Sequence, residues 1–139
     1  MAASRDAEGE LREAAQVGEV LQNQLAGIEE QLGMLRAMTE EFQQARSALD
    51  ALRAARVGDE VLVPLGGGQF VRAKLAEADR VLSGIGAGLS VEGPVAEALR
   101  RVEAQLQSAS EAQQKLASEG QRIVDQMHAL EARVAQLAG

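Results

Sequence analysis

Few residues of this chain have the types and the spacing that catalysis, phosphate binding or metal binding requires. Two glycine-rich runs, 66–68 and 84–88, come closest to a phosphate-binding loop. A P-loop continues with Lys and then Ser or Thr, but Gln69 follows the first run. The second run spaces its glycines two apart, which fails the G-x-G-x-x-G pattern, and it does not open a helix. Turn glycines with positive φ account for both runs.

Acid–base, thiol and metal chemistry have equally little support. The chain has no Cys and a single His, His128, which excludes disulfides, thiolate nucleophiles and Cys-based zinc sites and leaves no histidine pair. Paired carboxylates such as Glu29-Glu30 and Glu40-Glu41 are adjacent in sequence, so they diverge around a helix rather than converge. We therefore expect no enzyme, no catalytic or metal-binding residue and no cofactor.

Composition and charge indicate the structural class of the protein and exclude some kinds of partner. Of the 139 residues 46% are hydrophobic, but only two are aromatic, and the net charge is −7. This is the composition of long helices and coiled coils, and an acidic chain is a poor partner for nucleic acid. The N-terminus lacks an apolar signal segment, and no run of 18 apolar residues occurs. We expect a cytoplasmic protein without nucleic-acid or membrane partners.

Two long segments have the apolar spacing of coiled-coil helices. In the first, residues 10–57, apolar residues recur from Leu11 in steps of three and four, with one short step from Leu35 to Met38. Gly58 is expected to cap this helix, and residues 1–9 to form a flexible tail. In the second, residues 93–138, Pro94 is expected at the first helical position. The apolar positions that face the partner helix, here called the seam, run from Val95 to Leu137 in alternating steps of four and three without a break.

The two helical segments are matched in length. Each has about 45 residues, or roughly 70 Å of helix. We expect them to pair antiparallel within one chain, because an intramolecular hairpin requires matched lengths. The alternative is that each pairs with helices of other chains.

Between the helices, in residues 58–92, the apolar period changes to two. Strand patterns flank the turns at 66–68 and 85–87, which predicts two β-hairpins. Because no further helix exists to cover them, and an isolated hairpin is marginal in water, we expect these hairpins to assemble with other subunits. The expected assembly residues are Val61, Val63, Leu65, Phe70, Val71, Leu75, Val81, Leu82, Ile85, Leu89 and Val91.

Small residues thin the helical seam towards the chain termini. Ala14, Gly18 and Gly120 stand where the opposite helix offers large apolar residues, which predicts a shallow groove for unstructured apolar segments. Ordinary coiled-coil packing with frayed ends is the alternative. We call the ends of the two helices near the chain termini the tips. The tip residues expected to bind such segments are Val17, Val20, Leu21, Ile123, Met127, Leu130, Val134 and Leu137.

Residues 58–92, the connector between the two helical segments, closely resemble the corresponding part of the archaeal prefoldin α subunit. The resemblance rests on V-L-V-P-L-G-G-G at 61–68 and G-I-G-A-G at 84–88, set between two coiled-coil helices. Two hairpins instead of one place the chain in the α rather than the β class. The resemblance implies an α+β, mainly α fold: a long antiparallel coiled-coil hairpin, with two central β-hairpins that pair between subunits in a β-barrel platform.

The same resemblance implies a function. It is that of an ATP-independent holding chaperone, a hexamer of two α subunits and four prefoldin β subunits. Its coiled-coil tips bind unfolded or nascent client proteins and pass them to a group II chaperonin. The alternative is an oligomeric coiled-coil scaffold or adaptor that binds a folded partner.

Overall fold

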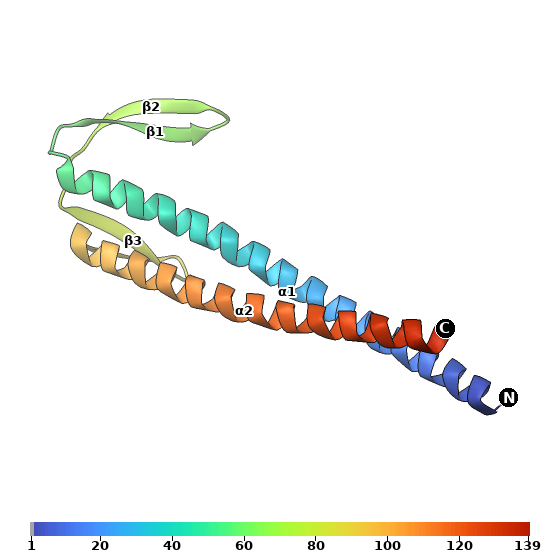
Figure 1. The fold of residues 1–139 in the computed structure, drawn as a ribbon. Coiled ribbons are helices and arrows are strands. Elements are labelled where there is room, and N and C mark those ends of the chain that lie inside the picture. Colours follow the sequence, from blue (N-terminus) through green and yellow to red (C-terminus); the bar gives the residue numbers. More distant parts are fainter. Residues whose placement is uncertain (1) are drawn as a thin grey trace. The chain divides into compact units, whose positions relative to one another are not determined.

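The computed structural model describes residues 2–139, and the side chains of residues 5–139. It contains two long helices and four strands in the order α1 (Ala2–Ala54), β1 (Glu60–Gly66), β2 (Gln69–Lys74), β3 (Arg80–Gly86), β4 (Leu89–Pro94) and α2 (Val95–Ala138) (Figure 1). Two compact units share these elements: residues up to 38 with 109–139, and residues 39–108. The expected fold class, two long helices with two antiparallel hairpins, is confirmed.

The N-terminal helix starts earlier and ends earlier than expected. Residues 2–9, expected as a tail, are helical, in keeping with their Ala, Arg and Glu content; Met1 lies outside the described residues. The helix ends at Ala54, not near Val57. Gly58, with φ of 91°, is no helix cap, because it lies in a turn that Asp59 N–H closes onto Arg56 O at 3.0 Å.

The start of the second helix also differs from the expectation. Pro94 is the last residue of β4, where it pairs with Arg80, and α2 begins at Val95. The Val95 N–H donates to Asp79 O at 3.0 Å, which ties the first helical residue to the segment before β3. Proline therefore ends a strand here instead of opening the helix, a position that its missing N–H also permits.

In the unit that contains both termini, the helices run antiparallel. Glu10 forms an ion pair with Arg133 at 3.8 Å. A Cβ built on Gly18 would lie 3.4 Å from Leu130 Cδ2, and one built on Gly120 would lie 3.6 Å from Ile28 Cγ2. Position rises along α1 as it falls along α2, so the expected pairing within one chain holds in this unit.

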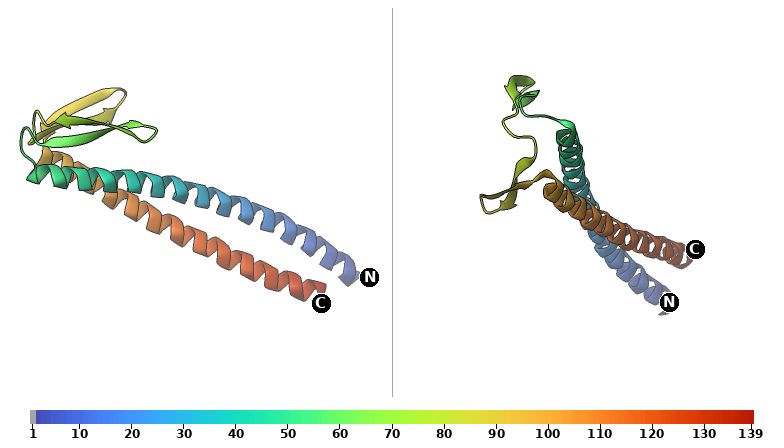
Figure 2. Two further views of the ribbon diagram at one scale, coloured as in Figure 1. Left: turned by 90° about the horizontal axis from the view of Figure 1, so that it is seen from above. Right: turned by 90° about the vertical axis from the view of Figure 1, so that its left-hand side faces the viewer.

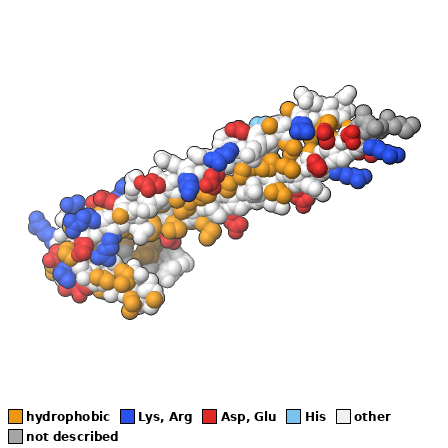
Figure 3. Space-filling model, turned by 90° about the horizontal axis from the view of Figure 1, so that it is seen from below, with side chains coloured by type: hydrophobic (Ala, Val, Ile, Leu, Met, Phe, Trp, Pro, Cys, Tyr) orange, Lys and Arg blue, Asp and Glu red, His pale blue; other side chains and the backbone are white. Residues whose placement is uncertain are grey.

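The seam of α2 matches the prediction and that of α1 differs at one place. Every predicted seam residue from Val95 to Leu137 is buried or half-buried. In α1 the assignment of Met38 was wrong: Met38 is exposed and Thr39 is half-buried. Because a helical turn has 3.6 residues, Thr39, four residues after Leu35, lies closer to the face of Leu35 than Met38 does, three residues after it. Figure 3 shows apolar side chains gathered along the helices, with charged side chains flanking them.

The buried core is thin. Its members are all hydrophobic and mostly small: Ala14, Leu21, Val95, Ala98, Leu99 and Ala109. Among the described residues no large side chain is fully buried, and no buried side-chain polar atom lacks a hydrogen bond. A seam between two helices accounts for this, because each seam residue has neighbours on one side only.

The connector folds into two separate two-stranded antiparallel sheets, β1–β2 and β3–β4 (Figure 2). Val63 is opposite Val71 in the first, and Ser83 is opposite Val91 in the second. Each register shifts just before its turn. Glycines provide the positive φ values of these turns except at Ala87, which has φ of 52°.

Candidate binding surfaces

Most of the hairpin side chains that were expected to mediate assembly are exposed in the structure. Val61 opposite Ala73 and Val63 opposite Val71 place three of the predicted assembly residues, Val61, Val63 and Val71, on one face of the first hairpin. Only Val61, Leu75 and Val81 of the predicted assembly set are half-buried. The remainder are exposed: Val63, Leu65, Phe70, Val71, Leu82, Ile85, Leu89 and Val91. Nothing in the described chain covers them.

The opposite face of the first hairpin also carries exposed apolar side chains, next to the charged residues Glu60, Arg72 and Lys74. Leu62 and Phe70 are 63% and 60% exposed, and they lie on the face that Val63 does not share. Leu62 was not among the expected assembly residues, although its neighbours in the sequence contain a signal. Val61-Leu62-Val63 is an uninterrupted apolar run, which is typical of a strand buried on both faces rather than one.

Each hairpin carries one ion pair across its strands. Arg72 Nε lies 3.3 Å from Glu60 Oε1 in the first hairpin, and Arg80 Nε lies 3.6 Å from Glu92 Oε1 in the second. All four side chains are largely exposed. Pairs of this kind contribute on the order of 0–1 kcal/mol to folding, so they add little to the stability of the hairpins.

The predicted tip residues divide into three groups. Val17 and Val20 are exposed, at 49% and 55%. Ile123, Met127, Leu130, Val134 and Leu137 are half-buried. Leu21, in contrast, is only 7% exposed, so a client could touch it only if the helices moved apart. The half-buried set is packed: Leu130 lies over Gly18, and Leu25 and Ile28 lie over Gly120.

A groove farther along the same helix pair was not expected. It measures about 440 Å³ and is lined by Met34, Leu35, Met38, Ala112, Leu116 and neighbouring polar residues. Met34 and Met38 are exposed and one helical turn apart. Flexible thioether side chains adapt to varied apolar shapes, which makes this groove a second candidate for holding unstructured segments. The misplaced seam at Met38 concealed it in the sequence.

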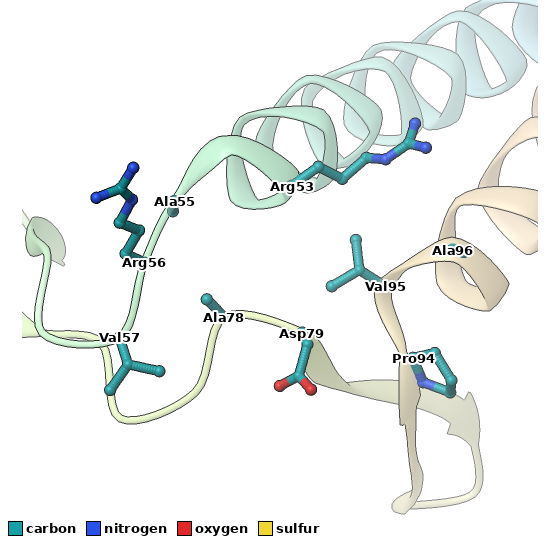
Figure 4. Close-up of a pocket in the computed structure, with 9 residues that line it drawn as sticks. All are labelled: Arg53, Ala55, Arg56, Val57, Ala78, Asp79, Pro94, Val95 and Ala96. Atoms are coloured by element: carbon teal, nitrogen blue, oxygen red, sulfur yellow. The ribbon is translucent and has the colours of Figure 1, made fainter.

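A hollow of a different kind lies at the base of the hairpins (Figure 4). It measures about 690 Å³ and is lined by the end of α1, the two linkers and the start of α2. The Arg56 and Asp79 side chains point in different directions. No convergent set of polar groups is present in this hollow, so it lacks the features of a ligand site.

No group of three or more His, Cys, Asp or Glu side chains among the described residues could hold a metal ion. No described helix is both long enough and apolar enough to cross a membrane.

Comparison with known proteins identifies the family. The prefoldin-subunit profile matches residues 21–139, which is most of the chain. The chain belongs to the prefoldin family. Among its relatives is the prefoldin subunit alpha of Methanothrix thermoacetophila, 41% identical over 86 residues. That match covers 62% of this chain and 56% of the relative.

Other prefoldin relatives align over nearly their whole length. The alpha subunit of Methanosarcina barkeri is 26% identical over 133 residues, covering 94% of this chain and 92% of the relative. A cryo-EM structure of filamentous prefoldin from Methanocaldococcus jannaschii has a TM-score of 0.71 and 24% identity, covering 84% of this chain and 97% of that one. The prefoldin fold and the resemblance to archaeal α subunits are thereby confirmed.

Proposed function

We propose that this chain is a subunit of a cytoplasmic, ATP-independent holding chaperone. Its hairpins assemble with other prefoldin subunits, in a complex of two α and four β subunits, and its helix pairs hold unfolded segments. The complex then passes them to a group II chaperonin. The observation that carries the proposal is the set of apolar hairpin side chains that the chain leaves uncovered, since exposed apolar patches mark interaction sites.

The helix pair is suited to weak binding of unfolded segments at several sites in one assembly. Val17 and Val20 add apolar surface near the chain termini without a deep pocket. A single contact of this size binds weakly, but several arms in one assembly raise the effective concentration of binding sites. Each contact stays weak enough to release its client, and no nucleotide is needed for the cycle.

The proposal is tested with the chain assembled with a prefoldin β subunit. The complex should suppress the aggregation of a denatured client without nucleotide, as measured by light scattering. In the double variant Val17→Ser/Val20→Ser we expect protection to fall several-fold while the mass of the complex is unchanged, because both side chains are already exposed.

The variant Met34→Ser/Met38→Ser tests the groove separately, because it removes two exposed side chains from that site and leaves Val17 and Val20 in place. If protection falls in this variant and not in the valine variant, clients bind in the groove and the tip assignment is wrong. If neither complex protects any client and the chain binds one folded protein instead, it is an adaptor and the chaperone proposal fails.

A further inference from the structure

Leucine and methionine occupy different parts of α1. Met34 and Met38 are 65% and 45% exposed. Every leucine of α1, in contrast, is buried or half-buried: Leu11, Leu21, Leu25, Leu32, Leu35, Leu49 and Leu52. Leucine would give the exposed positions a similar apolar surface, so the thioether sulfur is the group that distinguishes Met34 and Met38 from the rest of the helix.

The two exposed methionines belong to one site. Met34 and Met38 lie one helical turn apart on α1, and both line the groove of about 440 Å³ whose other apolar residues are Leu35, Ala112 and Leu116. Met38 lies outside the seam, because the seam continues at Thr39. A chemical change at either sulfur therefore alters the wall of the groove and leaves the seam between the helices packed.

The rim of this groove suits unfolded segments of varied sequence. Lys115 and Glu119 line it and carry opposite charges, so the groove does not favour one sign of charge next to the apolar part of a segment. Its wall is formed by flexible thioether side chains, which adapt to many apolar shapes. Both features fit the holding of many different clients.

Oxidation is the chemistry that an exposed thioether offers. The chain has four Met and no Cys, Trp or Tyr, so methionine is its main target for peroxides. The sulfur attacks one oxygen of hydrogen peroxide: an S–O bond forms, the O–O bond breaks, and the other oxygen leaves as water. Sulfur is oxidised to a sulfoxide and the peroxide is reduced. Met127 is half-buried in the seam of α2, so among the described methionines a peroxide in water reaches Met34 and Met38 first.

We propose that Met34 and Met38 form a reversible oxidation site that controls how strongly the groove holds unfolded segments. A sulfoxide is polar and needs hydrogen-bond partners that an apolar segment does not offer, so oxidation weakens the groove. A dithiol-dependent methionine sulfoxide reductase restores it: the sulfoxide oxygen leaves as water, the thioether forms again and the dithiol becomes a disulfide. The proposal rests on the holding role proposed above and adds its regulation.

The first test measures the reactivity of each sulfur. The isolated chain is treated with dilute hydrogen peroxide for increasing times, and the peroxide is then removed. Peptide mass spectrometry should find that Met34 and Met38 gain oxygen several-fold faster than Met127, since they are more exposed. The helical content, measured by circular dichroism, should stay unchanged, because both sulfurs lie outside the seam. Equal rates at the three positions would overturn the proposal.

The second test links oxidation to holding. The oxidised chain is assembled with an untreated prefoldin β subunit, so that no methionine of the partner is changed, and the aggregation of a denatured client is followed by light scattering. We expect protection to fall several-fold while the mass of the complex is unchanged. Treatment with the two methionine sulfoxide reductases, one for each sulfoxide epimer, and a dithiol should restore protection.

Two variants separate the sulfurs from the apolar surface around them. Met34→Leu/Met38→Leu removes both sulfurs and keeps good helix formers, so its protection should be the same before and after peroxide. Met1 and Met127 remain in this variant, which controls for their oxidation. Met34→Gln/Met38→Gln has the polarity of the sulfoxides and should protect less than the wild type without any peroxide.

The outcomes distinguish this proposal from the holding role. Undiminished protection by the oxidised wild type, or an equal loss in peroxide-treated Met34→Leu/Met38→Leu, would overturn the oxidation site and leave the holding role in place. Protection that the reductases do not restore would overturn its reversibility. A complex that fails to protect clients before oxidation would remove both proposals.

Discussion

The exposed apolar side chains of the first hairpin lead to a quantitative prediction about assembly. In Leu62→Ser/Phe70→Ser, both large side chains are removed from one face of the hairpin. Ser90 pairs with Gly84 in the second hairpin as Phe70 pairs with Pro64 in the first, in each case next to the register shift, so a hairpin of this kind folds with serine there. We expect the isolated chain to keep its helical content, because neither side chain is buried.

The expected loss of affinity follows from the exposure of the two side chains. Complete burial of a Leu or Phe side chain stabilises by about 1.5–3 kcal/mol. Leu62 and Phe70 retain 63% and 60% of their exposure in the chain, so burial of the remainder in an interface is worth about 1–2 kcal/mol each. Together they account for about 2–4 kcal/mol per hairpin, or about thirty-fold to several hundred-fold in the dissociation constant.

The assay is native mass spectrometry or sedimentation of the chain with a prefoldin β subunit across a dilution series. Met34→Ser is the matched control, since Met34 is 65% exposed but lies on α1, in the groove of the helix pair. The control should assemble like the wild type. Equal assembly of the hairpin variant and the control would refute the reasoning, because the hairpin face would then not be an interface.

Three further predictions concern stability, measured as the free energy of unfolding in urea. Ala87→Gly should stabilise the second hairpin by about 1 kcal/mol and Gly67→Ala should destabilise the first by a similar amount, because both equivalent positions have positive φ; no difference between them would contradict the strain argument. Gly120→Ala should stabilise the helix pair by about 1 kcal/mol, since a Cβ there makes only ordinary contacts, and a loss would show that the seam has no room. Leu21→Ala should cost about 2 kcal/mol and Val20→Ala less than about 0.5 kcal/mol, as their burial differs; equal costs would mean that Leu21 is not packed.

Prediction from the sequence succeeded where the pattern was long and regular. The seam of α2 is one uninterrupted repeat, so each residue from Val95 to Leu137 could be assigned to the inner side. In α1 the repeat is irregular near Met38, and there the choice between two adjacent residues was wrong. The exposed groove at Met34 and Met38 was missed for the same reason.

Element ends were harder to predict, because a local signal can serve more than one structure. Gly58 has the positive φ expected of a helix cap but uses it in a turn of the connector. Pro94 is compatible with the first helical position and with the end of a strand, and its pairing with Arg80 decided the matter. The tip residues stay predictions, since burial alone does not report what binds them.

The two helices and the two hairpins could be predicted without coordinates, because periodicity and turn residues are properties of the chain alone. Which apolar residues of the hairpins remain uncovered became clear only from the folded arrangement. Exposure depends on what the rest of the chain places over a side chain, and no local pattern contains that. Val61 and Val63 lie on the same face of β1, yet Val61 is half-buried and Val63 is exposed.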